Sequence, residues 1–167
     1  SLDPYVAITM DSEDASAVYI EKSAQFTQAP GPGGFHAISI QFTQIAYPAV
    51  TQIVILDETL TNQTGVDWTD FHWAALDGPN AAFNSALTDA AAGGTGFTTS
   101  PLDNQTWGAG NTTFTVDGYG LGAGGTDAVV AAGADWYPGN GALDGELFID
   151  VVPSENAPYT VFTLKER

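Results

Sequence analysis

The chain has 167 residues, of which 44% are hydrophobic, and it carries a formal net charge of −17 with only three basic residues. This length and apolar content predict one folded domain over residues 1–167 and exclude a globally disordered chain. The scarcity of lysine and arginine excludes a nucleic-acid partner, because phosphate binding requires a basic surface. The sequence has no cysteine, which excludes disulfides, and no run reaches the roughly 18 apolar residues of a membrane span.

The first half of the chain contains short runs in which apolar and polar residues alternate, as they do along β-strands. Such runs predict strands over 5–10, 16–21, 35–44, 51–58 and 66–75. The run at 51–58 is apolar on both faces, with Val54 and Leu56 on one face and Ile53 and Ile55 on the other. We therefore expect this strand either to be covered on two sides or to face a neighbouring subunit.

The second half predicts one short helix and further strands. An Asp-Gly-Pro start at 77–79 precedes apolar residues at helical spacing from Phe83 to Ala90. Strands are expected at 111–117 and 127–132, and two final strands, 146–152 and 159–165, are expected to pair across a proline-bearing loop. About nine strands with frequent turns predict an all-β fold, an antiparallel β-sandwich or jelly roll.

The sequence ends in T-V-F-T-L-K-E-R, in which Phe162, Thr163, Leu164 and Glu166 carry a resemblance to a known family. This ending is similar to the last sandwich strand, of the form F-T-L-x-E, that precedes the Pro-Glu-Pro sorting motif of secreted bacterial PEP-CTERM proteins, which exosortases process. The Pro-Glu-Pro motif itself does not occur here. The resemblance implies an extracellular or cell-surface protein whose C-terminal anchor either has been removed or is not included in this sequence.

Two groups of hard oxygen ligands are candidate calcium sites, and calcium is the only cofactor that the sequence suggests. Asp11, Glu13 and Asp14 lie within four residues of one another. They lack the central glycine and distal glutamate of an EF-hand loop, so a solvated acidic turn is the competing interpretation. The second group consists of Asp135, Asn140 and Asp144, across a glycine-rich turn.

A third polar group, Asp67, Asp70 and His72, is a candidate metal or acid–base cluster. On a strand Asp70 and His72 share a face and Asp67 does not, which favours a simple surface pair. The two histidines and scattered serines show no spacing typical of a catalytic triad. The protein is therefore expected not to be an enzyme.

Exposed tryptophans can stack on sugar rings, and Trp68, Trp107 and Trp136 are the candidates. The competing interpretation places Trp73 in the core and uses the other three to close the ends of the sandwich. Three N-x-Thr sequons, which chance can supply in so threonine-rich a chain, are candidate glycosylation sites in an exported protein. Their asparagines are Asn62, Asn104 and Asn111.

The N-terminal strand, within residues 1–10, is expected to pair with the open sheet edge of a neighbouring subunit or to dock in its own sandwich. The residues assigned to assembly are Tyr5, Val6 and Ile8 of this strand together with Val54 and Leu56. The leading hypothesis is a secreted, non-enzymatic structural protein that self-associates into a homopolymer, as a subunit of an extracellular filament, sheath or matrix. The alternative is a carbohydrate-binding β-sandwich module with an extracellular polysaccharide as its partner.

Overall fold

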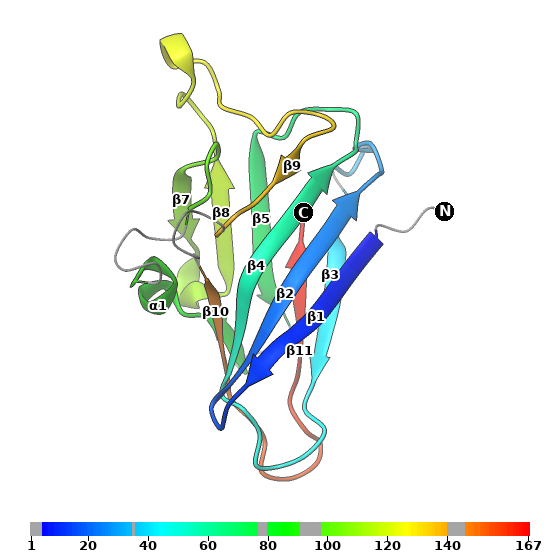
Figure 1. Ribbon diagram of the computed structural model, residues 1–167, viewed down its shortest axis with the longest axis vertical. Coiled ribbons are helices and arrows are strands. Elements are labelled where there is room, and N and C mark those ends of the chain that lie inside the picture. The colour runs from blue at the N-terminus through cyan, green and yellow to red at the C-terminus, as the bar shows by residue number, and fades with distance from the viewer. Residues whose placement is uncertain (1–4, 35, 77–79, 91–97, 140–145) are drawn as a thin grey trace.

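The computed structural model describes residues 5–34, 36–76, 80–90, 98–139 and 146–167. In this part of the chain, eleven strands form two sheets, and only one short α-helix occurs. Figure 1 shows the two sheets facing each other. The predicted all-β sandwich is confirmed, with a strand count somewhat above the expected nine or so.

The first sheet contains, in spatial order, β1 (Tyr5–Glu13), β2 (Ala17–Phe26), β4 (Gln52–Asn62), β10 (Leu147–Val151) and β6 (Ala81–Phe83). Off this path, β9 (Asp135–Trp136) pairs with the end of β4. The second sheet contains β3 (Ile38–Thr43), β11 (Val161–Glu166), β5 (Asp70–Leu76), β8 (Thr113–Asp117) and β7 (Asn104–Trp107). The helical elements are α1 (Ser85–Ala90) and two 3-10 turns, Ala109–Asn111 and Ala123–Gly125.

One strand pair departs from the antiparallel expectation: β2 and β4 run parallel. The chain leaves β2, forms β3 in the opposite sheet and returns to the first sheet beside β2. Because the intervening strand runs back in the other sheet, β4 arrives in the same direction as β2. All other strand pairs among the described residues are antiparallel.

The two final strands form as predicted, but they are not paired with each other. Leu147, Ile149, Phe162 and Leu164 are fully buried, as their alternation indicates. β10, however, pairs with β4 and β6, whereas β11 pairs with β3 and β5 in the other sheet. The proline-bearing loop between them is therefore a crossover between sheets, and the predicted hairpin is wrong.

Three further sequence predictions are corrected. Phe83, expected on the helix, lies in β6, and α1 begins only at Ser85; the predicted helix start at 77–79 lies outside the described residues. The predicted strand at 127–132 is reduced to a single bridge between Val130 and Trp68. Among the residues that the structure places, none of the helices has the length and apolar character that crossing a membrane would require.

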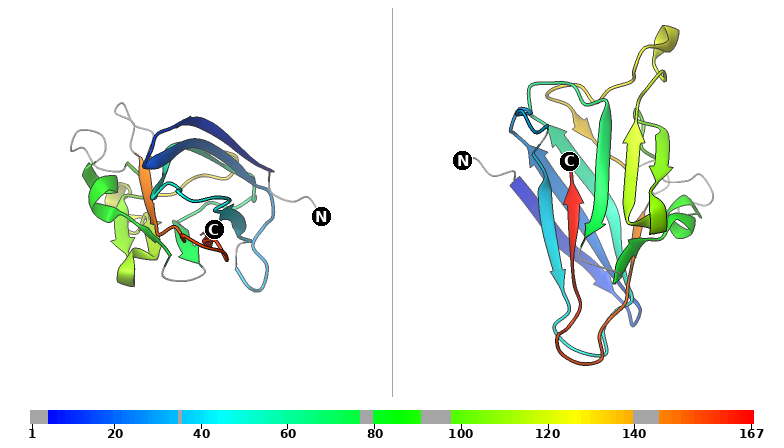
Figure 2. Two further views of the ribbon diagram at one scale, coloured as in Figure 1. Left: turned by 90° about the horizontal axis from the view of Figure 1, so that it is seen from below. Right: turned by 180° about the vertical axis from the view of Figure 1, so that it is seen from behind.

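The core between the sheets is built around aromatic rings from both layers. Figure 2 shows the two layers from below and from behind. Phe26 of the first sheet meets Phe71 of the second edge to face, at 5.6 Å between ring centroids. Trp73 is completely buried and stacks on Phe114 at 5.2 Å. The core position expected for Trp73 is confirmed, and these ring contacts join the two sheets.

A β-bulge in β4 reverses which residues face the core. The register with β2 runs from Ile20 opposite Ile55 to Glu21 opposite Asp57, so Leu56 is the extra residue. Before the bulge the odd-numbered Ile53 and Ile55 are buried in the core; after it the even-numbered residues are buried, namely Glu58, Leu60 and Asn62. The bulge thereby turns Glu58 from the outer face to the interior.

The turn between β1 and β2 is closed by the carboxylate of Asp14. Its Oδ1 accepts hydrogen bonds from the Ser16 backbone N–H at 2.7 Å, the Ser16 hydroxyl at 2.8 Å and the Ala17 backbone N–H at 2.9 Å. The bonds from Ser16, followed by that from Ala17, lower the pKa of Asp14 from 3.8 to about 2. Asp11 and Glu13 belong to β1 itself, so the acidic turn predicted at 11–14 begins only at Asp14.

We expect the Asp14 carboxyl group to titrate with a midpoint near 2 in the folded protein, because its charged form accepts these hydrogen bonds. Its contribution to stability is present above the unfolded-state value and is lost as the pH falls through the folded-state pKa. NMR titration of the side-chain carboxyl signals measures the midpoint, and Asp14→Asn identifies the signal. A midpoint near 3.8 would show that the turn does not hold the carboxylate.

Candidate functional site

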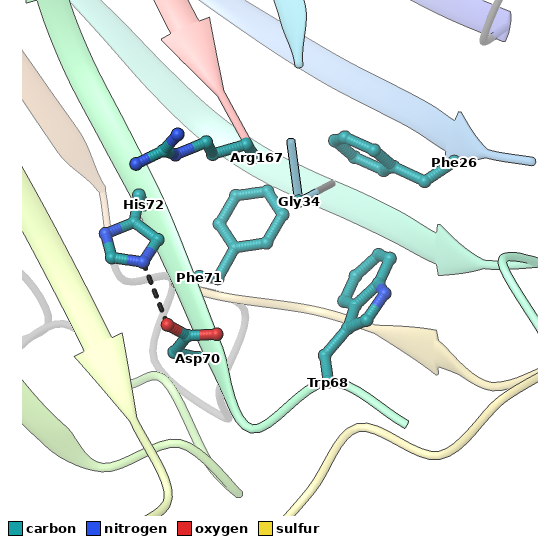
Figure 3. Close-up of a pocket in the computed structure, with 7 residues that line it drawn as sticks. All are labelled: Phe26, Gly34, Trp68, Asp70, Phe71, His72 and Arg167. Carbon is teal, nitrogen blue, oxygen red and sulfur yellow. Dashed lines mark hydrogen bonds and ion pairs between the residues drawn. The ribbon is translucent and has the colours of Figure 1, made fainter. Parts of the chain in front are cut away.

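A cavity of about 230 Å³ opens at one end of the sandwich, and Figure 3 shows the residues that line it. Polar side chains lie on one side and aromatic rings on the other. The lining residues are Phe26 of β2, Gly34, Trp68, the β5 residues Asp70, Phe71 and His72, and Arg167. The hollow is large enough only for a small ligand.

The polar side of this cavity contains the pair that the sequence predicts, Asp70 and His72. The His72 Nε2 lies 3.0 Å from the Asp70 Oδ2, and both side chains are about one-third exposed. The other ring nitrogen, Nδ1, lies 3.0 Å from the Thr115 hydroxyl on the neighbouring strand β8. Asp67 is not part of this pair; its carboxylate accepts the Ala132 backbone N–H at 2.8 Å.

The Asp70, His72 and Thr115 side chains are thus joined in the order of a catalytic triad, which sequence spacing did not indicate because the cross-strand register creates it. A triad also needs backbone N–H groups aimed at a developing oxyanion. Thr115 lies on the face of a sheet, in a strand paired on both sides with β5 and β7. The backbone N–H groups beside it are directed into those ladders, which favours a structural hydrogen-bonded pair.

A second polar group lies in the middle of the core, and it consists of Lys22 on β2, Glu58 on β4 and Glu166 on β11. Lys22 and Glu58 are direct register partners in one sheet, and Glu166 reaches them from the other. The Lys22 Nζ donates a hydrogen bond to the Glu166 Oε2 at 2.8 Å and another to the Glu58 Oε1. All three side chains are buried. We call these residues the buried triad.

The charges of the buried triad are not balanced, because one ammonium group faces two carboxyl groups. Burial raises the pKa of Glu166 to about 8; the positive charge of Lys22 opposes the increase, and the nearby Glu58 adds to it. Burial alone would lower the pKa of Lys22, but attraction to Glu166 and Glu58 outweighs burial and raises it. Glu166 is therefore the carboxyl group of the triad whose neutral form burial favours near neutral pH.

The sequence analysis did not identify this triad, although the alternation of residues in β2 and β11 indicates that Lys22 and Glu166 face the core. Phe162 and Leu164 occupy alternate positions of the last strand, and the same alternation continues to Glu166. Lys22 likewise follows the buried Ile20 at the next inward position. Glu58 offered no such signal, because only the bulge at Leu56 turns it inward.

The candidate calcium ligands are not gathered into a site in the described part of the chain, where no group of three or more acidic or histidine side chains is placed to hold a metal ion. The Asp14 carboxylate is engaged in the β1–β2 turn. Asp135 accepts a hydrogen bond from the Thr61 hydroxyl at 2.7 Å. Its predicted partners, Asn140 and Asp144, lie outside the described residues, so calcium binding stays a prediction.

The three tryptophans proposed to stack on sugars differ in how exposed their rings are. Trp68 and Trp136 are buried in the core cluster, so neither offers an open ring face. The Trp136 indole N–H donates to the backbone carbonyl of Ser100 at 3.1 Å. Trp107 is only half-buried, but one of its faces stacks on Phe114 at 4.0 Å between centroids. The carbohydrate alternative is thereby reduced to Trp107.

The three sequons differ in how accessible their asparagines are. The Asn62 side chain is completely buried, and its Nδ2 donates to the backbone carbonyls of Val66 and Val130 at 2.8 and 3.0 Å. It is therefore closed to glycosylation in the folded chain, which corrects the prediction for this residue. Asn104 and Asn111 are both partly exposed, so glycosylation at these two residues stays a prediction.

No protein-family model matches the sequence, and searches of curated proteins and of solved structures give no significant match. The functional argument therefore depends on the sequence and the geometry of this chain.

The Lys22→Met variant tests the electrostatics of the buried triad. Removing the ammonium leaves two carboxyl groups in the core, which costs about 3–5 kcal/mol. Without Lys22 the pKa of Glu166 stays above the ordinary value of 4.5. The folded variant keeps a proton that the unfolded chain releases, so its stability is highest at low pH and falls as the pH rises from about 5 to 8. Urea unfolding at several pH values measures this loss.

The matched control is the triple variant Lys22→Met, Glu58→Gln, Glu166→Gln, in which neutral amides replace both carboxyl groups. We expect it to be more stable than Lys22→Met at pH 8 and to show a much weaker dependence on pH between 5 and 8. Equal pH dependence in the two variants would mean that the glutamates are not the groups that titrate.

Proposed function

We propose that this protein is a secreted, non-enzymatic structural protein of the cell surface, which self-associates as a subunit of an extracellular filament, sheath or matrix. The observation that carries the proposal is the open outer edge of β1, which bears exposed apolar side chains. The resemblance of the last strand to PEP-CTERM proteins supports the extracellular location.

β1 is the first strand of its sheet, with β2 on one side and no strand among the described residues on the other. The N-terminal strand is thus docked in its own sandwich, and its free edge still offers unpaired backbone groups to another strand. The edge from Tyr5 to Glu13 is nine residues long and is interrupted by a register shift between Met10 and Ser12, so its regular part lies between Tyr5 and Met10. A strand from a neighbouring subunit would complete its hydrogen bonding.

The exposed apolar residues on β1 lie on the face that is turned toward the core. Ile8 and Met10 stand opposite Lys22 and Ile20, which are both buried, and directly paired residues share a face. Even so, Ile8 is 43% exposed and Met10 is 60% exposed. The opposing sheet ends at β3, so this stretch of β1 is left uncovered, and a second copy would bury it.

The residues assigned to assembly from the sequence do not all lie on this surface. Ile8 does, and Val6 is half-buried and packs against the core. Val54 is completely buried within its own chain, so it cannot form a contact surface, and Leu56 is the half-buried residue of the bulge. The side chain of Tyr5 lies outside what the structure describes. Met10, which the sequence analysis left out, belongs to the exposed surface instead.

The strong negative charge sets the conditions under which such assembly occurs. Subunits with a formal charge of −17 repel each other, and salt screens this repulsion over about 8 Å at physiological ionic strength. A homopolymer also needs two different complementary surfaces, because pairing one edge with its own copy stops at a dimer. The outer edges of β3 and β7 in the second sheet are the candidates for the second surface.

The Met10→Lys variant tests the assembly surface. A lysine on this edge places a charge where the neighbouring strand would have to pack, and we expect it to abolish self-association. Sedimentation velocity and electron microscopy, at low and high salt and with and without calcium, compare it with the unaltered chain. The unaltered chain should form larger assemblies as salt rises.

The matched control is Leu87→Lys, which makes the same kind of change at an apolar residue of α1 that is 41% exposed. It should assemble like the unaltered chain, because α1 lies away from the β1 edge (Figure 1). An unaltered chain that stays monomeric at high concentration under all these conditions would refute the proposal.

A further inference from the structure

The buried triad has features that an ordinary buried ion pair does not need. A lysine Nζ lies within hydrogen-bonding distance of two carboxyl groups, in a position from which water is excluded. The remaining oxygens, Oε2 of Glu58 and Oε1 of Glu166, make no hydrogen bond within the described chain. Unpaired buried carboxyl oxygens are costly, so the arrangement calls for an explanation beyond stability.

We propose that the buried triad is a self-processing site, at which the Lys22 Nζ and the Glu166 side-chain carboxyl group condense to an intramolecular amide with Glu58 as the proton-transfer residue. Such a bond would be a covalent cross-link between the two sheets of a chain that has no cysteine. It goes beyond the proposed structural role, because the amide would form in each subunit whether or not subunits assemble.

The geometry assigns the roles of the two glutamates. Glu58 and Lys22 are register partners in the same sheet, so Glu58 is held beside the ammonium group by the ladder itself. Glu166 approaches from the opposite sheet, with its Oε2 at 2.8 Å from Nζ, and the carbon that would be attacked is one bond beyond that oxygen. Glu166 is also the carboxyl group whose neutral form is favoured by burial, and a neutral carboxylic acid is the better electrophile.

The reaction balances without an oxidant or a co-reactant. The Lys22 ammonium transfers a proton to the Glu58 carboxylate, which leaves a neutral amine and two neutral carboxyl groups. The Nζ lone pair attacks the Glu166 Cδ, and a C–N bond forms. Glu58 gives its proton to the departing hydroxyl group of Glu166 and takes one from Nζ, so the C–O bond breaks and one water molecule leaves. Glu58 ends as a neutral carboxylic acid.

Two physical effects favour this condensation in the core. Groups held in contact react with effective concentrations of about 10⁵–10⁸ M, which offsets the unfavourable equilibrium of amide formation in water. The product also replaces an ammonium, a carboxylate and a carboxylic acid by an amide and one carboxylic acid, so no charge remains buried. The water that is released passes to bulk solvent.

The test is the intact mass of the purified full chain, measured after denaturation. We expect the unaltered protein to be lighter than its sequence mass by one water molecule, and tandem mass spectrometry of a digest to find the peptide containing Lys22 joined to that containing Glu166. Mild alkaline treatment must leave the deficit unchanged. An aspartyl succinimide, for example at Asp117-Gly118, loses the same mass but is hydrolysed by this treatment.

Three variants make the test specific. Lys22→Arg keeps the positive charge but has no amine to acylate, and Glu58→Gln removes the proton-transfer group; both should show the full sequence mass. Lys165→Arg, at a lysine outside the buried triad, should keep the deficit of one water. Circular dichroism and thermal unfolding establish that Lys22→Arg and Glu58→Gln are folded, because an unfolded variant would also show the full mass.

The full sequence mass in the folded, unaltered protein would overturn the proposal, and so would a deficit that persists in Lys22→Arg. A cross-linked peptide that joins Lys22 to Glu58 instead of Glu166 would refute the assignment of roles. Because the readout is a mass, none of these results depends on whether the protein assembles.

Discussion

The contact of Lys22 with Glu58 and Glu166 is the constraint around which this sandwich is built. Charged groups in an apolar core are strongly destabilising unless each finds its partner, so the triad fixes the alignment of the three strands that carry it. β2 and β4 must run parallel in one register to place Lys22 beside Glu58, and β11 must lie opposite them to deliver Glu166. An arrangement of the sheets that left Lys22 without its carboxyl partners would bury an unpaired ammonium group, which is strongly destabilising.

Much of the fold follows from local alternation, which is why it could be predicted from the sequence. The inward faces of β8, β10 and β11 are set by residues such as Phe114, Ile149 and Leu164, whose burial needs no knowledge of their partners. Strand partners could not be predicted, because alternation determines which face is buried and not which strand lies beside it. From the sequence, the loop after Val151 was equally compatible with a hairpin and with a crossover to the other sheet.

For the candidate sites too, contacts within one strand could be predicted from the sequence, whereas contacts between distant strands could not. Asp70 and His72 were identified because two residues of one strand share a face wherever the strand lies. The buried triad depends on long-range pairing across sequence separations of 36 and 144 residues, and on a bulge that no periodicity reveals. For the tryptophans, the sequence suggested a site that the structure does not provide. Trp68 and Trp136 are of the residue type that stacks on sugar rings, and only their neighbours in the fold show that both rings are enclosed.

The buried triad and the open edge of β1 are close neighbours, and this proximity connects the two proposals. Ile8 of β1 is the register partner of Lys22, so the lysine lies one strand inward from the uncovered apolar surface and on the same face. Force applied to a subunit through β1 would pass to β2 and would tend to peel this hairpin away from the opposite sheet. An amide from Lys22 to Glu166 would join the two sheets at that level of the edge. A chain without cysteine that is loaded at its edge strand would therefore gain from a covalent bond at this position, because the backbone crossovers between the sheets lie at the ends of the strands and only non-covalent packing joins the sheets at this level.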